Sequence, residues 1–209
     1  MTHPPASAAE RPAPPPADPI ARFNALLAEA KSIDRALLPE PTAFALGTVS
    51  PDGQPAVRML LLKGADERGF VFYTNLESRK GRELSTTGRA ALCFHWQPME
   101  VQVRVEGGVE RTSDLEADAY FASRRRGSQI GAWASRQSQI IAPPSELERR
   151  VAEVEAQFAG KDVTCPPNWG GFRVVPARIE FWKNMPSRLH VRHLYTRAGS
   201  AWRVDTLYP

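Results

Sequence analysis

Residues 44–63 read FALGTVSPDGQPAVRMLLLK, and this stretch decides the fold. Two apolar runs, 44–49 and 56–62, flank the turn sequence SPDG, which is typical of a β-hairpin. The consecutive apolar residues 59–62 lack the polar alternation of a strand that has one face in water. We therefore expect a hairpin whose second strand is covered on both sides, on one of them by a second copy of the chain.

The rest of the chain continues with short strand patterns and few helices. A helix is predicted after Asp18-Pro19, where an N-cap precedes a first-turn proline, and three more are predicted at 78–86, 114–124 and 146–158. The last two begin at Ser-x-x-Glu capping boxes. Further strands are predicted at 69–74, 90–96, 101–111, 171–182, 187–196 and 201–207. This order predicts a mainly β, α+β fold with a closed or split antiparallel barrel.

Length and composition indicate one globular domain. The chain has 209 residues, 42% of them apolar and 24% charged, so a core can form without disulfides. Residues 1–17 are low-complexity Pro and Ala sequence, so we expect a disordered tail and a single domain at 18–209. No apolar run could span a bilayer and no signal peptide is recognisable, which predicts a cytosolic protein that does not bind membranes.

The charge balance favours a small anionic ligand. Lys and Arg number 27 against 23 Asp and Glu, which favours anionic partners. The densest basic run, Arg124-Arg125-Arg126, is short and lacks a nucleic-acid-binding motif, so we expect no nucleic-acid partner. Cys93 and Cys165 lie far apart without metal-ligand spacing, so no metal site is expected either.

A strand-to-helix junction is the first candidate phosphate site. Tyr73 and Thr74 end a predicted strand, and Arg79 and Lys80 open the next predicted helix. Free N–H groups at a helix start bind phosphate, whereas two cations without a ligand there would oppose the helix dipole. The alternative is an exposed basic first turn.

Tyr120, Arg124 and Ser128 form a second candidate. Their spacing of four residues would place a phenol, a guanidinium and a hydroxyl on one helix face, a suitable set for a phosphate monoester. Gly127 could instead end the helix, and Ser128 would then turn in from a loop. In isolation, such a triple is more often a polar outer face.

Two strand segments complete the candidates. RMLLLK places Arg58 and Lys63 at the ends of an apolar strand, where buried cations require anions. RLHVR would place Arg188, His190 and Arg192 on one strand face, where like charges repel unless an anion or a polarised ring faces them. Solvated strand ends and a solvated strand face are the alternatives.

Taken in order, these segments resemble the pyridoxine/pyridoxamine 5'-phosphate oxidase family. The resemblance runs from Thr42 to Pro209, and the chain keeps the family's order of motifs. Those motifs are RMLLLK, YTN-x-x-SRKGRE, QVRVEG, YFASR-x-x-GS, ASRQSQ, EFW and RLH-x-R. The resemblance implies a homodimeric split barrel with short peripheral helices and FMN at the subunit interface. It also implies oxidation of pyridoxine and pyridoxamine 5'-phosphates to pyridoxal 5'-phosphate, with O2 reduced to hydrogen peroxide.

The resemblance also assigns residues to roles. Arg188 and His190 would be the catalytic pair over the pyridine ring. The substrate would also contact Lys63, Tyr120, Arg124 and Ser128. FMN would contact the side chains or backbone of Arg58, Met59, Leu60, Leu61, Leu62, Lys63, Tyr73, Thr74, Arg79, Lys80, Gln102, Gln137, Ser138, Trp182 and Arg192.

Several positions depart from the family pattern, and other functions compete with the oxidase. The departures are Val101, Lys183, Asn184, Met185 and Val191, and they bear on substrate preference and dimer contacts. One rival is a flavin oxidase of a phenazine pathway on the same scaffold, against which the phosphate-binding set argues. Another is a non-catalytic carrier of FMN or pyridoxal phosphate, which would be expected to lack Arg188 or His190.

Overall fold

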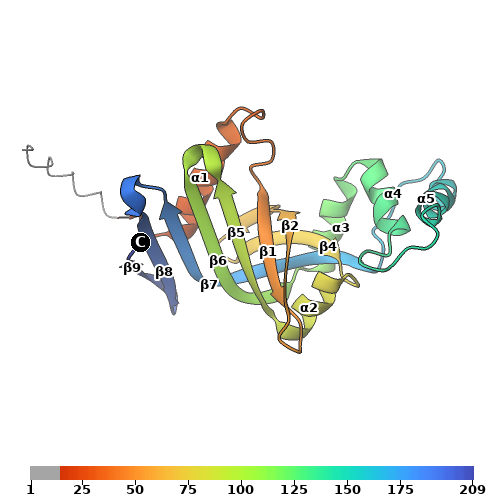
Figure 1. The fold of residues 1–209 in the computed structure, drawn as a ribbon. Coiled ribbons are helices and arrows are strands. Elements are labelled where there is room, and N and C mark those ends of the chain that lie inside the picture. Colours follow the sequence, from red (N-terminus) through yellow and green to blue (C-terminus); the bar gives the residue numbers. More distant parts are fainter. Residues whose placement is uncertain (1–14) are drawn as a thin grey trace, which may run out of the picture.

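The computed structural model describes residues 15–209, in which nine antiparallel strands form one curled sheet (Figure 1). The main path runs in the order β2-β1-β5-β6-β7-β4-β3, and β8 and β9 extend from β7. The strands are β1 Ala43–Val49, β2 Pro55–Leu61, β3 Gly64–Asp66, β4 Gly69–Asn75, β5 Arg89–Trp96, β6 Val101–Arg111, β7 Trp169–Lys183, β8 Val191–Ala198 and β9 Ala201–Thr206.

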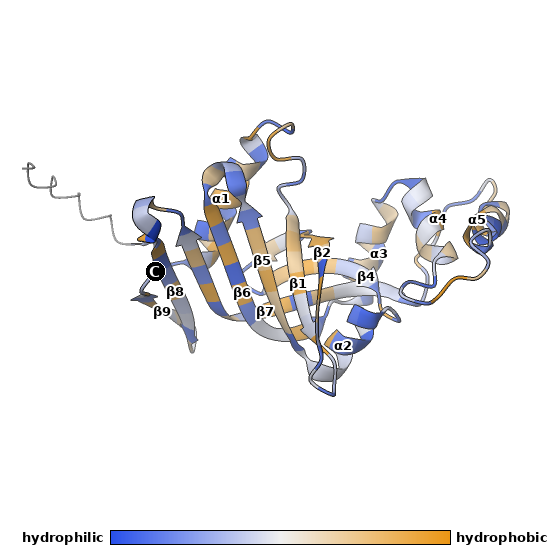
Figure 2. Cartoon of the chain, viewed as in Figure 1, coloured by the Kyte–Doolittle hydropathy of each residue, from blue (hydrophilic) through white to orange (hydrophobic). Residues whose placement is uncertain are grey.

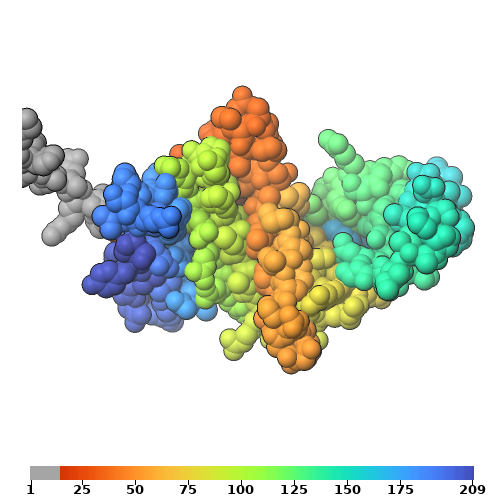
Figure 3. All heavy atoms as spheres, in the orientation of Figure 1, coloured from red at the N-terminus to blue at the C-terminus, as the bar shows by residue number. Residues whose placement is uncertain are grey.

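Five α-helices lie around the sheet. They are α1 Pro19–Ser32, α2 Arg79–Thr87, α3 Asp114–Ala122, α4 Arg126–Ala134 and α5 Glu146–Gln157, and two 3₁₀ turns are η1 Gln97–Met99 and η2 Pro186–Arg188. Helices α3, α4 and α5 form a helical lobe at one end of the molecule, and β8 and β9 lie at the other end (Figure 1). The space-filling view shows the β1–β2 hairpin standing between these two ends (Figure 3).

The hairpin predicted from residues 44–63 is confirmed. β1 and β2 pair from Ala43↔Leu61 to Val49↔Pro55. The Gly53 amide donates to the Ser50 carbonyl at 2.9 Å, and Gly53 has a φ of +88°, in the left-handed region that glycine tolerates. β2 is an edge strand, so this hairpin forms one border of the sheet.

β7 is the longest strand and joins the two parts of the sheet. Its first half pairs with β4 and its second half with β8, while β6 follows it along both halves. The register shifts at a bulge between Glu106 and Gly107, opposite Pro176. A Cβ on Gly107 would lie 2.0 Å from the Val175 carbonyl oxygen, so the close approach of the two strands at this bulge requires glycine.

The main core lies on the inner face of the curled sheet, which α1 closes. Alternating apolar and polar residues are visible along β5 and β6 (Figure 2). Phe23 of α1 is fully buried, and its ring lies 4.9 Å from the rings of both Phe70 and Phe94 in edge-to-face geometry. A second apolar cluster holds the helical lobe together and includes Phe121, Ile130 and Trp169.

Most predicted elements are present, with shifted ends. Asp18 caps α1, accepting from the Ile20 amide at 2.8 Å, and Ser113 with Glu116 forms the expected capping box of α3. Ser145 forms no side-chain cap, because its backbone is already helical, so the second capping box was wrong. Helix α4 and the short strand β3 were not predicted.

The predicted strand at 187–196 was wrong over its first part. Strand β8 begins only at Val191. Pro186 opens a 3₁₀ turn instead, and Ser187 and Arg188 have φ values of 58° and 61°. Arg188 and His190 therefore do not share a strand face with Arg192. Proline lacks the N–H that strand pairing needs, which explains the turn.

Other sequence predictions lie partly outside the described residues. The tail predicted at 1–17 falls almost entirely in the part of the chain that the structure does not describe. Within residues 15–209, no helix is long and apolar enough to cross a membrane, and no cluster of His, Cys, Asp and Glu could hold a metal ion. The cytosolic location stays a prediction.

Replacing Phe23 with Ala tests the role of α1 in closing the core. The change removes a fully buried ring, so the free energy of unfolding should fall by about 3–5 kcal/mol. Denaturant unfolding measures this. Leu115→Ala is the control, because that side chain is 80% exposed on α3, and it should change stability by less than about 0.5 kcal/mol. Equal effects of the two changes would contradict this view of the core.

Candidate active site

A cavity of about 980 Å³ lies between the sheet and the helical lobe. Its walls come from β2, β4, the start of α2, the α3–α4 junction and the start of β7. Among its charged lining residues, cations outnumber acids, with Lys63, Lys80, Arg124 and Arg125 against Glu40. This excess of positive charge favours an anionic ligand.

Lys80 is a buried cation at the start of α2. Its ammonium group lies 3.0 Å from Gln137 Oε1 and 3.3 Å from Thr74 Oγ1. Burial, with the charge of Arg58 as a further cause, lowers the pKa of Lys80. Since no carboxylate pairs with Lys80 among residues 15–209, its charge is available to a ligand in the cavity.

The helix start that carries Lys80 depends on Gly81. Ser78 caps α2, and its hydroxyl accepts from the Gly81 amide at 3.2 Å. A Cβ on Gly81 would lie 2.2 Å from the Leu76 carbonyl oxygen. The tight turn into the helix therefore requires glycine next to the cation.

Arg58 and Arg79 meet around one buried carboxylate, Glu83. Arg58 Nη2 lies 3.2 Å and Arg79 Nε 2.7 Å from the Glu83 carboxylate, and Thr48 Oγ1 donates to it at 2.5 Å. Burial alone would raise the pKa of Glu83, but the hydrogen bonds from Thr48 and Arg79 and the nearby arginine charges hold it below its usual value. Arg79, one of the two cations predicted to contact phosphate at this helix start, is thus already partnered, as is Arg58, whereas Lys80 is not.

Arg124 lies against the aromatic wall of the cavity. Its guanidinium carbon is 5.0 Å from the Trp169 ring centroid and 5.5 Å from that of Phe121. Its Nη1 atom is buried without a hydrogen-bond partner, and burial lowers the pKa of Arg124. Arginine stays charged even so, so this atom is a donor available to an anion in the cavity.

The predicted substrate residues meet at the junction between α3 and α4, and not on one face of a single helix as the sequence predicted. Helix α3 ends at Ala122 and α4 begins at Arg126, so Tyr120 and Ser128 lie on two different helices. Both still line the cavity with Arg124 and Lys63. The Lys63 ammonium lies 5.6 Å from the Tyr120 ring centroid.

A second group of predicted residues lies elsewhere, on the sheet face formed by β6, β7 and β8. Gln102 pairs with Trp182, and Trp182 pairs with Arg192. The His190 ring lies 4.6 Å from the Trp182 ring, and Arg192 donates from Nε to Glu180 at 2.7 Å. Arg188 is exposed in the neighbouring turn.

The structure therefore divides the predicted site into two half-sites. The first half-site is the cavity, which takes in Met59, Leu60, Leu61, Lys63, Tyr73, Thr74, Lys80, Tyr120, Arg124, Ser128 and Gln137. The second half-site comprises Gln102, Trp182, Arg188, His190 and Arg192, and none of these lines the cavity.

Four predicted residues fall outside both half-sites. Arg58 and Arg79 flank Glu83 beside the first half-site. Leu62 is 4% exposed and belongs to the core. Ser138, with a φ of 74°, lines a neighbouring pocket with Ile140 and Ile141.

Strand β7 connects the two half-sites and sets their separation. Trp169 at its first residue lines the cavity, and Trp182 near its end belongs to the second half-site. Thirteen steps of about 3.3 Å give roughly 40 Å of strand between them. The two half-sites of one chain therefore lie at opposite ends of the sheet.

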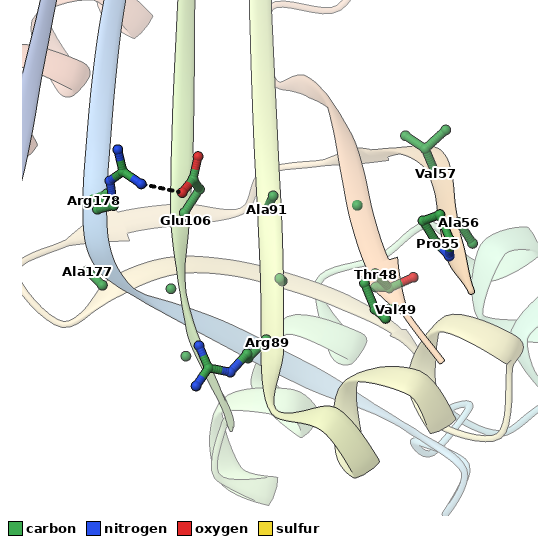
Figure 4. Close-up of a pocket in the computed structure, with 14 residues that line it drawn as sticks. Thr48, Val49, Pro55, Ala56, Val57, Arg89, Ala91, Glu106, Ala177 and Arg178 are labelled. Atoms are coloured by element: carbon green, nitrogen blue, oxygen red, sulfur yellow. Dashed lines mark ion pairs between the residues drawn. The ribbon is translucent and has the colours of Figure 1, made fainter. Parts of the chain in front are cut away.

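The outer face of the sheet carries an apolar surface beside the hairpin. Val57 and Met59 of β2 are 72% and 65% exposed. A hollow of about 810 Å³ beside Val57 runs from Pro55 and Val57 on one side, past Ala91, to the Glu106–Arg178 ion pair on the other (Figure 4). Exposed apolar surface of this kind marks contact sites.

Trp169 is a prominent residue of the candidate site that the sequence interpretation missed. Its ring is nearly parallel to those of Tyr73 and Tyr120, at 4° and 11°. The two glycines after Trp169, Gly170 and Gly171, were the signal in the sequence that side chains crowd together here. A Cβ on Gly171 would lie 2.6 Å from the Tyr73 ring. Small residues in a strand indicate that neighbouring side chains approach closely.

Comparison with solved structures identifies the fold class. The chain is similar to PhzG from Burkholderia lata 383, solved with tetrahydrophenazine-1-carboxylic acid. The TM-score is 0.86 at 33% identity, covering 93% of this chain and 94% of that one. A pyridoxamine 5'-phosphate oxidase-related, FMN-binding protein from Nostoc punctiforme shares the fold, with a TM-score of 0.72 at 18% identity. The predicted split-barrel fold class is confirmed.

Sequence comparison identifies the family. Residues 34–158 match the pyridoxamine 5'-phosphate oxidase family model, and residues 169–209 match the pyridoxine 5'-phosphate oxidase C-terminal dimerisation region. A pyridoxine/pyridoxamine 5'-phosphate oxidase from Myxococcus xanthus is 59% identical over 93% of both chains, and one from Rubrobacter xylanophilus is 56% identical over 92% of this chain and 87% of that one. The chain belongs to the pyridoxine/pyridoxamine 5'-phosphate oxidase family, as its motifs predicted.

Glu83→Gln should make the stability of the protein less sensitive to acid. Because the pKa of Glu83 is lowered in the folded chain, its ionisation stabilises the fold above the pKa of an unfolded Glu, and this stability is lost as the pH falls through the lower folded pKa. The wild type should therefore lose more stability than the variant between about pH 6 and about pH 3. Thermal unfolding across this range measures the difference, and parallel profiles would show that Glu83 does not hold the two arginines as charged partners.

Proposed function

We propose that the protein is an FMN-dependent oxidase that converts pyridoxine and pyridoxamine 5'-phosphates to pyridoxal 5'-phosphate. O2 is the terminal acceptor and is reduced to hydrogen peroxide, and the amine substrate also consumes water and releases ammonia. The family assignment supports both the oxidoreductase activity and FMN. The observation that carries the proposal is the cavity in which Lys80 and Arg124 have no anionic partner within residues 15–209.

The Lys80 side of the cavity fits the phosphate of FMN. Lys80 supplies a partly desolvated charge, and Thr74 and Gln137 supply hydrogen-bonding groups within 3.3 Å of it. Arg79 is half exposed at the same helix start and can donate from the guanidinium nitrogens that Glu83 does not engage. Bound FMN supplies the hydride-accepting ring that no side chain can provide.

The Arg124 side fits the phosphate of the substrate. The buried Nη1 of Arg124 requires an acceptor, and the Tyr120 and Ser128 hydroxyls lie in the same cavity. Lys63 adds a second cation near Tyr120. These residues bind the remote end of the substrate and so orient the carbon that is oxidised.

The second half-site comes from the partner subunit of a homodimer. The dimerisation region at residues 169–209 contains Trp182, Arg188, His190 and Arg192. In a two-fold dimer, the second half-site of each chain can face the first half-site of the other, which places FMN at the interface. The exposed face of β2 and the hollow beside it form part of the subunit contact.

In this dimer, Arg188 and His190 lie over the substrate ring. Their positive and hydrogen-bonding groups orient the ring and stabilise charge as it is oxidised. Ser187 and Arg188 have left-handed backbones, a costly conformation that clusters at functional sites. His190 is held by the Trp182 ring and by the Met185 amide, which lies 3.3 Å from its Nδ1.

The phenazine-pathway alternative is less well supported. The similarity to PhzG is 33% in sequence, whereas relatives named for vitamin B6 phosphates reach 59%. The unpaired Arg124 also favours a phosphorylated substrate. Anaerobic bleaching of bound flavin by pyridoxine or pyridoxamine 5'-phosphate tests the function, and failure of both esters to reduce it would refute the proposal.

Lys80→Ala and Arg79→Ala should weaken FMN binding to different extents. Lys80 has only neutral partners, whereas Arg79 already pairs with Glu83. Loss of Lys80 should therefore raise the Kd for FMN by about 10- to 100-fold, and loss of Arg79 by less than about tenfold. Fluorescence titration of apoprotein with FMN measures both constants. A larger effect of Arg79→Ala would reverse this assignment.

Arg124→Ala should remove the preference for phosphorylated substrates. We expect KM for pyridoxine 5'-phosphate to rise at least tenfold, because a charge-assisted bond to the phosphate is lost. The KM for unphosphorylated pyridoxine should stay nearly unchanged. Steady-state oxidation of the two substrates gives the comparison, and an equal rise in both values would show that Arg124 does not contact the phosphate.

Val57→Glu should dissociate the homodimer. The change puts a carboxylate into the apolar surface of β2, where burial against a second copy would leave it unpaired. Sedimentation should show a monomer with weakened FMN binding. Leu115→Glu is the matched control at an exposed leucine of α3. A Val57→Glu protein that stays dimeric at micromolar concentration would place the contact on another face.

A further inference from the structure

We propose that Trp169 is a positioning residue that aims the Arg124 guanidinium at the substrate phosphate. This inference rests on the proposed function, because it assigns Arg124 to that phosphate. Trp169 is 8% exposed, it lines the first half-site, and its ring centroid lies 5.0 Å from the Arg124 guanidinium carbon. That distance is within the range of a cation–π contact.

Arg124 has little else to fix its direction. No carboxylate pairs with it among the described residues, and its Nη1 is buried without a hydrogen bond. Phe121 gives a second ring contact at 5.5 Å, but Phe121 itself packs edge-to-face on Trp169, at 5.1 Å and 72°. Trp169 therefore contacts both the guanidinium and the other ring that supports it.

Trp169 is itself held rigidly. Its backbone opens β7, where it pairs with Asn75 at the end of β4, and its amide donates to Pro166 at 3.0 Å. Its ring lies 5.3 Å from Tyr73 and 5.9 Å from Tyr120, nearly parallel to both. A long arginine side chain on such a fixed surface loses less rotational freedom when it binds its ligand.

An aromatic platform suits a phosphate-binding arginine better than a carboxylate would. A carboxylate would orient the guanidinium but also neutralise it and occupy its N–H donors. The face of an indole attracts the cation and leaves those donors free. Trp169 thus keeps the charge of Arg124 available to the substrate, in contrast to Arg58 and Arg79, which both pair with the Glu83 carboxylate.

The first test measures KM and kcat for Trp169→Leu and Trp169→Phe. Leucine removes the platform, so KM for pyridoxine 5'-phosphate should rise about tenfold, whereas phenylalanine should restore most of the affinity. The kcat and the KM for unphosphorylated pyridoxine should change less than about twofold. A fall in kcat without a change in KM would overturn the inference.

Trp133→Leu is the matched control for loss of a tryptophan from the helical lobe. Trp133 packs on Phe158 and donates from Nε1 to the Thr164 carbonyl at 2.7 Å, and it does not line the first half-site. This change should lower thermal stability and leave KM unaltered. An equal rise in KM for Trp133→Leu and Trp169→Leu would show that Trp169 only supports the fold of the helical lobe and does not position Arg124.

A double-mutant cycle tests whether Trp169 acts through Arg124. In the Arg124→Ala background, Trp169→Leu should add less than about twofold to KM, because the group that it positions is gone. A full tenfold further rise would show that Trp169 acts independently of Arg124, and would contradict the inference.

Binding of inorganic phosphate separates this inference from the proposed function. Calorimetry on the FMN-loaded protein should show phosphate binding that weakens about tenfold in both Trp169→Leu and Arg124→Ala. If the wild type binds phosphate in this way but oxidises neither vitamin B6 ester, the proposed function fails and the role of Trp169 stands. If the wild type oxidises the esters and Trp169→Leu binds phosphate normally, the role of Trp169 fails alone.

Discussion

Strand β7 separates the two groups of side chains to which we assign the reaction, and the rest of the proposed site depends on this separation. Trp169 and Trp182 stand near its two ends, and a strand cannot fold back within itself to bring them together. The bulge opposite Pro176 bends the strand but does not reverse it. The proposed site therefore requires a second copy of the chain. This proposal accounts for the match of residues 169–209 to a dimerisation region and for the exposed apolar surface of β2.

In and beside the first half-site, the partners of each cation indicate its role. Glu83 pairs with both Arg58 and Arg79, so its carboxylate offsets part of their charge. Among the described residues, Lys80 hydrogen-bonds only to neutral groups and Arg124 lies against aromatic rings. Because a partly buried charge without an anion is costly, these two positions are the ones that a bound phosphate would stabilise most. In the proposed function, these two positions are separate anion sites in one cavity, Lys80 for the cofactor and Arg124 for the substrate.

Local signals predicted most of the fold, and three-dimensional contacts decided the rest. The SPDG turn, the Asp18 cap and the Ser113 capping box each fix a backbone conformation within a few residues, so the elements beside them were predicted. Helix α4 lacks such a cap and begins at Arg126 after a short break; it is stabilised by packing of Ile130 and Ala134 in the helical lobe. The strand expected through Arg188 failed because Pro186 starts a turn. Trp169 could not be assigned a role because its partners Tyr73, Tyr120 and Arg124 are distant in sequence.

In the proposed dimer, each site combines the first half-site of one chain with the second half-site of its partner. The most direct test purifies heterodimers, with one tag on each chain, from co-expressed Arg124→Ala and Arg188→Ala chains. If the two residues come from different subunits, one of the two sites in each heterodimer is intact, and the turnover with pyridoxine 5'-phosphate should reach about half that of the wild-type dimer. Each mutant homodimer should be nearly inactive under the same subsaturating conditions. A heterodimer as inactive as the two homodimers would show that both residues serve a site within one chain, and would contradict the account.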